Sequence, residues 1–240
     1  MQEIKLAEIL KKKIASFTDD LKDLYKEDLV SVILYGSAAS AEFVEKHSNL
    51  NFLIVLKSTE LPILRKAADL TRKFPYLEPL FMTENFISSS ADVFPIEFLD
   101  IKENYAIIYG KDILKEMQID TKNLRFQCEH ELKVKLMSLR QLFLKFSNDA
   151  KALERVLFKT FTSVLHISRN MLRLKGKAAP YKKEQIINEL SLNFGLNKTL
   201  WVEILNAKNR QAKISKAELE DLFIRFCEEL ERVVEITDKL

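Results

Sequence analysis

The sequence predicts an α/β (α+β) domain with a mixed sheet over residues 1–120, followed by an all-α helical bundle domain over residues 121–240. In the first part, apolar β-branched runs alternate with segments whose apolar residues recur at three- and four-residue steps. This alternation is typical of strands and helices that share one sheet. After Leu124 the helical spacing continues almost to the end of the chain. The boundary between the two parts is predicted near Asp120 to Arg125.

The predicted elements of the first part follow from these local patterns. A long opening helix is indicated by apolar residues from Ile4 to Leu21, and helical spacing returns from Leu61 to Phe74. A short helix at 37–47 and a loop or short helix at 84–93 complete the non-strand segments. The predicted strands are Leu29–Ser37, Asn49–Lys57, Glu78–Thr83, Phe94–Lys102 and Asn104–Gly110.

The second part reads as a series of amphipathic helices joined by short connections. Gly176 and Pro180 close one of them, and Ser215 with Glu218 has the capping-box form that begins another. The predicted helices are 126–146, 151–175, 182–192, 198–208 and 215–240. Their apolar stripes predict an antiparallel bundle.

Composition excludes several functional classes. The chain is 47% hydrophobic and 30% charged, with a net charge of +3, so we expect a globular protein without a polybasic nucleic-acid-binding tail. The two cysteines, Cys128 and Cys227, form no CxxC or Cys/His cluster, and a structural zinc site is not expected. Charges interrupt every apolar run of the opening segment. We therefore expect a soluble, cytoplasmic protein with neither signal peptide nor membrane span.

The most informative motif joins the first two predicted strands. Gly36 and Ser37 close an apolar strand, and the tripeptide Asn49-Leu50-Asn51 opens the next one, twelve positions after Ser37. A glycine lets the backbone approach a ligand closely, and a hydroxyl beside helix-start amides can bind phosphate oxygens. Two polar residues separated by one position point to the same face of a strand.

This motif resembles the signature of the nucleotidyltransferase superfamily, which includes kanamycin nucleotidyltransferase, the MNT antitoxins and DNA polymerase β. The resemblance covers roughly Leu29 to Gly110. In that family a glycine and a glycine or serine are followed, about ten residues later, by Asp-x-Asp or Asp-x-Glu. The two acids hold divalent metals that activate the attacking hydroxyl and steady the leaving pyrophosphate. A third carboxylate from a neighbouring strand completes the cluster.

The resemblance assigns roles to individual residues of this chain. It implies nucleotide binding by Gly36, Ser37, Asn49 and Asn51, with the two asparagines where the family has its metal-binding acids. It also implies a third, catalytic carboxylate, for which Glu97 is the first candidate. Asp100 is the alternative.

The two asparagines determine the functional prediction. An amide offers a neutral oxygen where magnesium prefers a carboxylate, and it supplies no base to an incoming hydroxyl. We therefore expect a protein with a degenerate active site that lacks metal-dependent nucleotidyl transfer and binds a nucleotide or a partner. One alternative is an active nucleotidyltransferase of altered chemistry that uses Glu97 or Asp100. The other is an antitoxin-like interaction module.

The same resemblance leads to predictions about cofactors, ligands and partners. No cofactor is assigned, and magnesium is expected only if the active-enzyme alternative holds. A nucleoside triphosphate, a protein or nucleic-acid partner and a homodimer are the open possibilities. Basic residues also gather around the helix predicted at 151–175, where they form a solvated face or, if they line a cleft, receive phosphates. They are Arg155, Lys159, Arg169, Arg173, Lys175, Lys177, Lys182 and Lys183.

Overall fold

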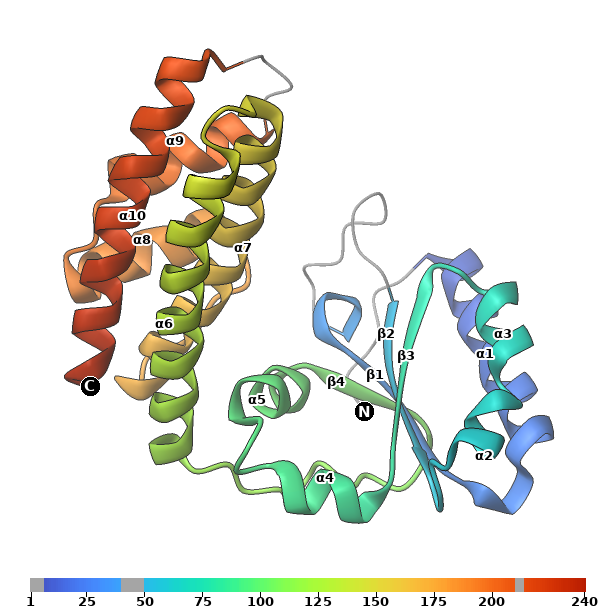
Figure 1. The fold of residues 1–240 in the computed structure, drawn as a ribbon. Helices are drawn as coiled ribbons and strands as arrows, with labels where there is room; N and C mark the ends of the chain where they lie inside the picture. Colours follow the sequence, from blue (N-terminus) through green and yellow to red (C-terminus); the bar gives the residue numbers. More distant parts are fainter. Residues whose placement is uncertain (1–6, 40–49, 210–213) are drawn as a thin grey trace. The chain divides into compact units, whose positions relative to one another are not determined.

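The structure, a computed structural model, describes residues 7–39, 50–209 and 214–240. It divides into two compact units, Met1–Ile119 and Asp120–Leu240 (Figure 1). We call the first the sheet unit and the second the helical unit. The fold class predicted from the sequence, a mixed sheet with helices followed by a helical bundle, is confirmed.

A four-stranded mixed sheet forms the centre of the sheet unit, with the strand order β3-β2-β1-β4. The strands are β1 (Leu29–Tyr35), β2 (Leu50–Leu56), β3 (Leu77–Met82) and β4 (Tyr105–Gly110). β1 pairs antiparallel with β2 and β4, whereas β2 pairs parallel with β3. The parallel pair needs a crossover, which contains the helices α2 (Leu61–Arg65) and α3 (Ala68–Lys73).

Helices cover both faces of this sheet, which explains why β1 and β2 read as continuous apolar runs. On one face lie α1 (Glu8–Tyr25), α2 and α3, and the ring of Phe17 packs 5.2 Å from Phe52 and 5.5 Å from Phe74 (Figure 1). On the other face lie α4 (Glu84–Ser90), α5 (Pro95–Glu103) and the segment after β4. There Phe98 and Ile87 pack in one core with Ile33, Leu53 and Val55.

The helical unit follows the predicted series of helices. They are α6 (Thr121–Phe146), α7 (Ala150–Leu174), α8 (Lys183–Phe194), α9 (Lys198–Asn209) and α10 (Lys216–Asp238). The aromatic rings of Phe161, Trp201 and Phe226 meet at its centre, with centroids 5.8 to 6.4 Å apart. The capping box predicted at Ser215 and Glu218 is confirmed. Within the described ranges, no helix combines the length and apolar character needed to cross a membrane.

The predicted strand Phe94–Lys102 is wrong, because this segment forms the helix α5. Pro95 stands at the first helical position, where its fixed φ is favourable and its missing N–H costs nothing. The buried side chains of Ile96, Phe98 and Ile101 then recur at two- and three-residue steps, so the apolar side faces the sheet as a helical stripe. A short apolar run of this length is compatible with either structure in sequence.

Two of the predicted helices differ from the structure in their extent. The helix predicted at 61–74 is divided into α2 and α3 by residues 66–67. The helix predicted at 37–47 begins as a 3₁₀ turn, η2 (Gly36–Ala39), and its remainder lies outside the described residues.

A substitution at Gly110 can test how closely β4 approaches β1. Its φ is +82°, and a Cβ built there would overlap the carbonyl oxygen of Val30. Gly176 also has a positive φ, of +65°, but a Cβ there meets nothing within 4 Å. We therefore expect Gly176→Ala to cost about 1 kcal/mol through backbone strain alone. Gly110→Ala should cost more than about 2 kcal/mol, because the clash adds to the strain.

Hydrogen exchange of the amides in each unit, followed as urea is raised, measures both costs locally. Equal losses for the two variants would contradict the close approach of β4 to β1.

Candidate functional site

Four side chains, one from each strand, form a polar row across one end of the sheet. In register, Tyr105 of β4 lies opposite Tyr35 of β1, Tyr35 opposite Asn51 of β2, and Asn51 opposite Glu78 of β3. Residues paired in this way carry their side chains on the same face. The next row on this face is apolar throughout and consists of Ile107, Ile33, Leu53 and Leu80. The polar row therefore lies at the end of the sheet where β1 runs into Gly36.

Gly36 and Asn51 are brought into contact at this end. Gly36 has a φ of +77°, and a Cβ there would lie 3.2 Å from the Nδ2 atom of Asn51. The Gly36 N–H donates to the carbonyl oxygen of Asn104, 3.0 Å away, which ties the turn to the start of β4. Glycine is thus favoured here by its backbone conformation and by the space that the Asn51 amide occupies.

The remaining predicted nucleotide-binding residues are only partly described. Ser37 follows Gly36 in the 3₁₀ turn η2, so its backbone lies at the end of β1. Asn49 precedes β2 and lies outside the described residues. The nucleotide-binding role of all four residues, Gly36, Ser37, Asn49 and Asn51, stays a prediction.

Glu78 is the acidic residue that sequence reasoning missed. It is exposed and lies directly beside Asn51 in the parallel β2–β3 pair. A neighbouring strand is where the family resemblance requires its third carboxylate. One feature of the sequence could have indicated Glu78, because it is the first residue of the predicted strand Glu78–Thr83. The parallel pairing that brings it beside Asn51 is not visible in the sequence.

Glu97 and Asp100 lie on α5 and not on a strand. Glu97 is exposed and Asp100 is half-buried, on a helix that covers the same face as the polar row. The assumption that placed them beside the asparagines, a strand at 94–102, is therefore wrong. Their catalytic role stays a prediction, but it is no longer supported by a strand that would place them beside the asparagines.

Burial and charge act on the two phenols of the polar row. Burial raises the pKa of Tyr35 above its ordinary value, and the negative charge of Glu78 raises it further. Burial also raises the pKa of Tyr105, and the neighbouring Asp112 adds to this because it accepts a hydrogen bond from the phenol at 3.0 Å. Both phenols are therefore protonated at neutral pH and can donate hydrogen bonds.

The polar row does not fit a pair of magnesium ions. Magnesium binds through carboxylates and phosphate oxygens in a strict octahedron, and the row supplies one carboxylate, that of Glu78. Asn51 contributes a neutral amide. In the part of the chain that the structure describes, no group of three or more His, Cys, Asp or Glu side chains is arranged to hold a metal ion.

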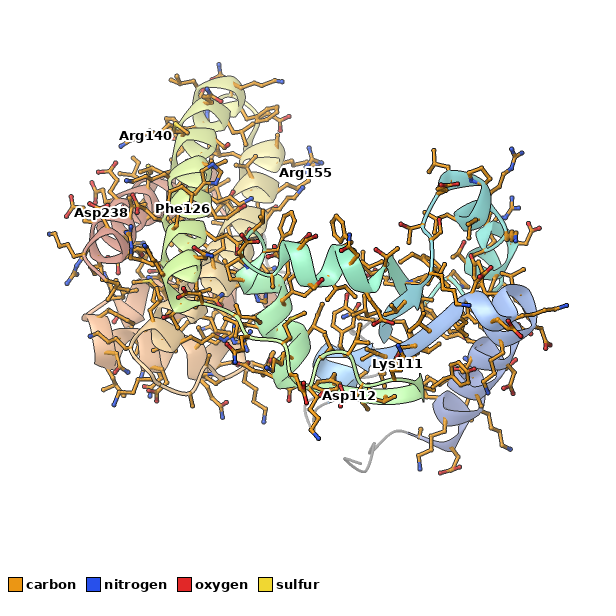
Figure 2. All side chains as sticks on the ribbon, turned by 90° about the horizontal axis from the view of Figure 1, so that it is seen from below. Lys111, Asp112, Phe126, Arg140, Arg155 and Asp238 are labelled. Atoms are coloured by element: carbon orange, nitrogen blue, oxygen red, sulfur yellow. The ribbon has the colours of Figure 1, made fainter. Side chains whose placement is uncertain are left out.

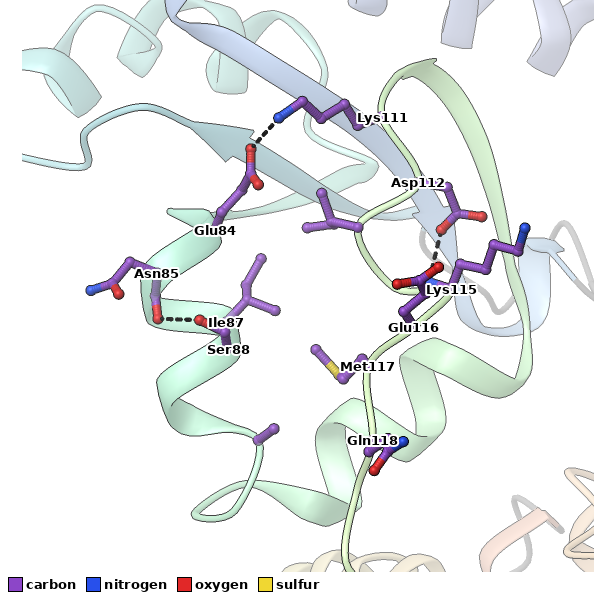
Figure 3. A pocket seen from close by; sticks show the side chains of 12 residues that line it. Glu84, Asn85, Ile87, Ser88, Lys111, Asp112, Lys115, Glu116, Met117 and Gln118 are labelled. Atoms are coloured by element: carbon purple, nitrogen blue, oxygen red, sulfur yellow. Dashed lines mark hydrogen bonds and ion pairs between the residues drawn. The ribbon is translucent and has the colours of Figure 1, made fainter.

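A separate hollow of about 540 Å³ lies between α4 and residues 111–118 (Figure 3). An ion pair between Lys111 and Glu84, 3.2 Å long, stands at its rim, and Ile87 and Met117 contribute apolar surface. Asp112 also lines it and is the acceptor for Tyr105. The hollow contains none of the predicted site residues, but Asp112 connects it to the polar row.

The mixed four-stranded sheet with its helices and the helical bundle that follows agree with the nucleotidyltransferase fold predicted from the sequence. A solved structure with this fold is spectinomycin adenyltransferase AAD(9) from Enterococcus faecialis, determined with ATP and spectinomycin. The two chains superpose with a TM-score of 0.60 and 13% identity over 92% of this chain and 99% of that chain. No protein-family model matches the sequence, and a search of curated protein sequences finds no relative. At this identity the likeness concerns the fold.

The register of the polar row is testable through the pKa of Tyr35. We expect Glu78→Gln to lower this pKa, because it removes the charge that destabilises the phenolate. The pKa should stay above the ordinary value, since burial is the larger cause. Titration of ¹³C-labelled tyrosine rings by NMR measures the change.

Asp112→Asn is the matched control, and it should lower the pKa of Tyr105 while leaving Tyr35 unchanged. A Glu78→Gln variant with an unaltered Tyr35 titration would contradict the register of β1, β2 and β3.

Proposed function

We propose that the protein binds a nucleoside triphosphate at the glycine-turn end of the sheet and does not carry out two-metal nucleotidyl transfer. The observation that carries this proposal is the position of Asn51 between Tyr35 and Glu78, in contact distance of Gly36. The family resemblance requires a metal-binding acid at that position.

An amide at this position changes how phosphate can be bound. An ionised aspartate only accepts hydrogen bonds and needs a cation between itself and a phosphate oxygen. The Nδ2 group of Asn51 can donate to a phosphate oxygen directly. Asn49 is the second asparagine of the motif and offers the same chemistry, which supports phosphate binding without a bridging metal.

ATP is the nucleotide to test first. AAD(9) was determined with ATP, and its likeness extends over 92% of this chain. Since one fold hosts many activities, this is an argument by analogy of fold. It says nothing in favour of spectinomycin as a ligand here.

We expect ATP binding to be independent of magnesium. Calorimetric titration in EDTA and in magnesium chloride should give dissociation constants within about threefold of each other, since no pair of carboxylates requires a metal. Asn51→Leu should weaken binding about tenfold, because it removes one hydrogen bond to a charged phosphate.

Asn85→Leu is the matched control, because Asn85 is an exposed asparagine on α4, away from the polar row. Strict dependence on magnesium, or no binding of any nucleoside triphosphate, would sink the proposal.

Restoring both acids should bring magnesium into the site. The double variant Asn49→Asp with Asn51→Asp would add two carboxylates to that of Glu78, and carboxylates are the ligands that magnesium prefers. We expect ATP affinity to become magnesium-dependent, measured by the same titration. Adding Glu78→Gln to the double variant should reduce this dependence, whereas adding Glu97→Gln should not. The opposite order would assign the third acid to α5.

One observation favours a second candidate function, a transferase of altered chemistry. Glu78 retains a carboxylate beside Asn51 and could accept a proton from an incoming hydroxyl. Transfer of labelled nucleotide by the wild-type protein that is lost in Glu78→Gln would favour this candidate. Loss in Glu97→Gln or Asp100→Asn would favour the acids first predicted from the sequence.

A further inference from the structure

The hollow between α4 and residues 111–118 is part of the folded sheet unit, and α4 forms one of its walls. The Thr83 hydroxyl caps α4 by accepting a hydrogen bond from the Phe86 N–H, 3.1 Å away. Ile87 is 2% exposed and belongs to the core on this face of the sheet. Contact with the sheet therefore fixes the position from which α4 presents Ile87 and Ala91 to the hollow.

The segment that follows β4 forms the second wall and is anchored at several points. Asp112 accepts hydrogen bonds from the N–H groups of Leu114 and Lys115, 3.2 and 3.1 Å away, and Leu114 is fully buried. The Met117 N–H donates to the Leu114 carbonyl oxygen at 3.2 Å, and the Lys102 ammonium donates to the Met117 carbonyl oxygen. The hollow is thus preformed. Its volume of about 540 Å³ lies within the range of roughly 300–1,000 Å³ that is typical of small-molecule sites.

The floor of the hollow is apolar, and its rim carries charges of both signs. Figure 3 shows Ile87 and Met117 projecting into the hollow from opposite walls. Among the described residues, the ionisable side chains that line it are three acids and two lysines: Glu84, Asp112, Glu116, Lys111 and Lys115. A ligand with a single charge would meet charges of its own sign at this rim. The rim therefore favours a ligand that carries one charge of each sign.

The ion pair between Lys111 and Glu84 gives the charges of the rim a direction. Lys111 and Asp112 follow β4 directly (Figure 2), and Glu84 is the first residue of α4, so the pair joins the two walls. The Lys111 Nζ atom lies 3.2 Å from the Glu84 Oε1 atom, and the two side chains are 70% and 46% exposed. An ion pair this exposed adds little to stability, so its two groups remain available to a ligand.

We propose that the hollow binds a free α-amino acid with an apolar side chain. Such a molecule carries its ammonium and its carboxylate on one carbon atom, so the two charges are close together, as they are in the Lys111–Glu84 pair. Aligned antiparallel to that pair, its carboxylate contacts Lys111 and its ammonium contacts Glu84. Its side chain lies on the floor formed by Ile87 and Met117. This inference goes beyond nucleotide binding at the polar row and does not depend on it.

L-Leucine is the first probe, and Met117 is the reporter. The full-length protein is labelled with ¹³C-methyl methionine, and leucine is titrated in at constant ionic strength. The chain has five methionines, so single substitutions assign each signal. We expect the Met117 methyl signal to shift and to saturate, whereas that of Met137, an exposed residue of α6, should not shift. A Met117 signal that does not respond to leucine would overturn the proposal.

Three analogues separate the contributions of the ligand's groups. N-acetyl-leucine lacks the ammonium and 3-methylbutylamine lacks the carboxylate, and each should bind at least about tenfold more weakly than leucine. Alanine, with a shorter side chain, should also bind about tenfold more weakly, because it covers less of the apolar floor. If 3-methylbutylamine or N-acetyl-leucine bound as tightly as leucine, the site would recognise a single charge and the proposal would be wrong.

Substitutions of the ion pair test the position of the ligand. Glu84→Gln and Lys111→Gln should each weaken leucine binding about tenfold, as expected for the loss of one charged hydrogen-bonding partner. Lys73→Gln is the matched control. Lys73 forms an ion pair with Asp20 at 2.7 Å, with side chains 59% and 35% exposed, between helices on the other face of the sheet. Leucine binding that is weakened equally by Lys73→Gln, or unaffected by both rim substitutions, would contradict the site.

The two binding sites of the sheet unit are separable by the same titrations. Asn51→Leu should leave the leucine-dependent shift of Met117 unchanged, because Asn51 does not line the hollow. Failure of nucleotide binding at the polar row is therefore distinguishable from failure of amino-acid binding in the hollow.

Discussion

The antiparallel pairing of β1 with β2 is the constraint on which the sheet unit depends. Both strands are buried on both faces, between the helix layer of α1 to α3 and that of α4 and α5. A slip of one residue would move every side chain of a strand to the opposite face. The register that satisfies both cores also sets Tyr35 opposite Asn51 and leaves Gly36 against the Asn51 amide. Core packing and site geometry are thus fixed by the same hydrogen-bond ladder.

Local patterns were sufficient for most of the fold and for part of the site. The strands around Ile33 and Leu53 and the capping box at Ser215 follow from composition and spacing that act within a few residues. The strand predicted at Phe94–Lys102 is wrong because its apolar residues suit a strand or a helix, and packing against the sheet decides between them. Glu78 was missed for a different reason. Its neighbour Asn51 is far away in sequence, and the parallel pairing is set by the α2–α3 crossover.

The polar row at the end of the sheet contains more hydrogen-bond donors than acids. The row consists of two protonated phenols, one amide and one acid, Glu78. This end of the sheet therefore offers hydrogen-bond donors in place of metal ligands. Such an arrangement suits an anionic ligand, because phenol and amide donors are directional. Donors of this kind can bind a phosphate oxygen without a bridging metal.

The position of β3 at the edge of the sheet gives the polar row unequal rigidity. Separating β2 from the sheet would break two ladders, whereas separating β3 would break one. Tyr35 and Asn51 are therefore anchored by the central strands, and Glu78 is carried by the element with the lower free energy of local opening. Pro79, next to it, donates no hydrogen bond, which also discourages the exposed edge from pairing with another chain. Glu78 itself is exposed, so its side chain can change without disturbing either core, whereas Tyr35 and Asn51 sit in the central strands that hold both cores together.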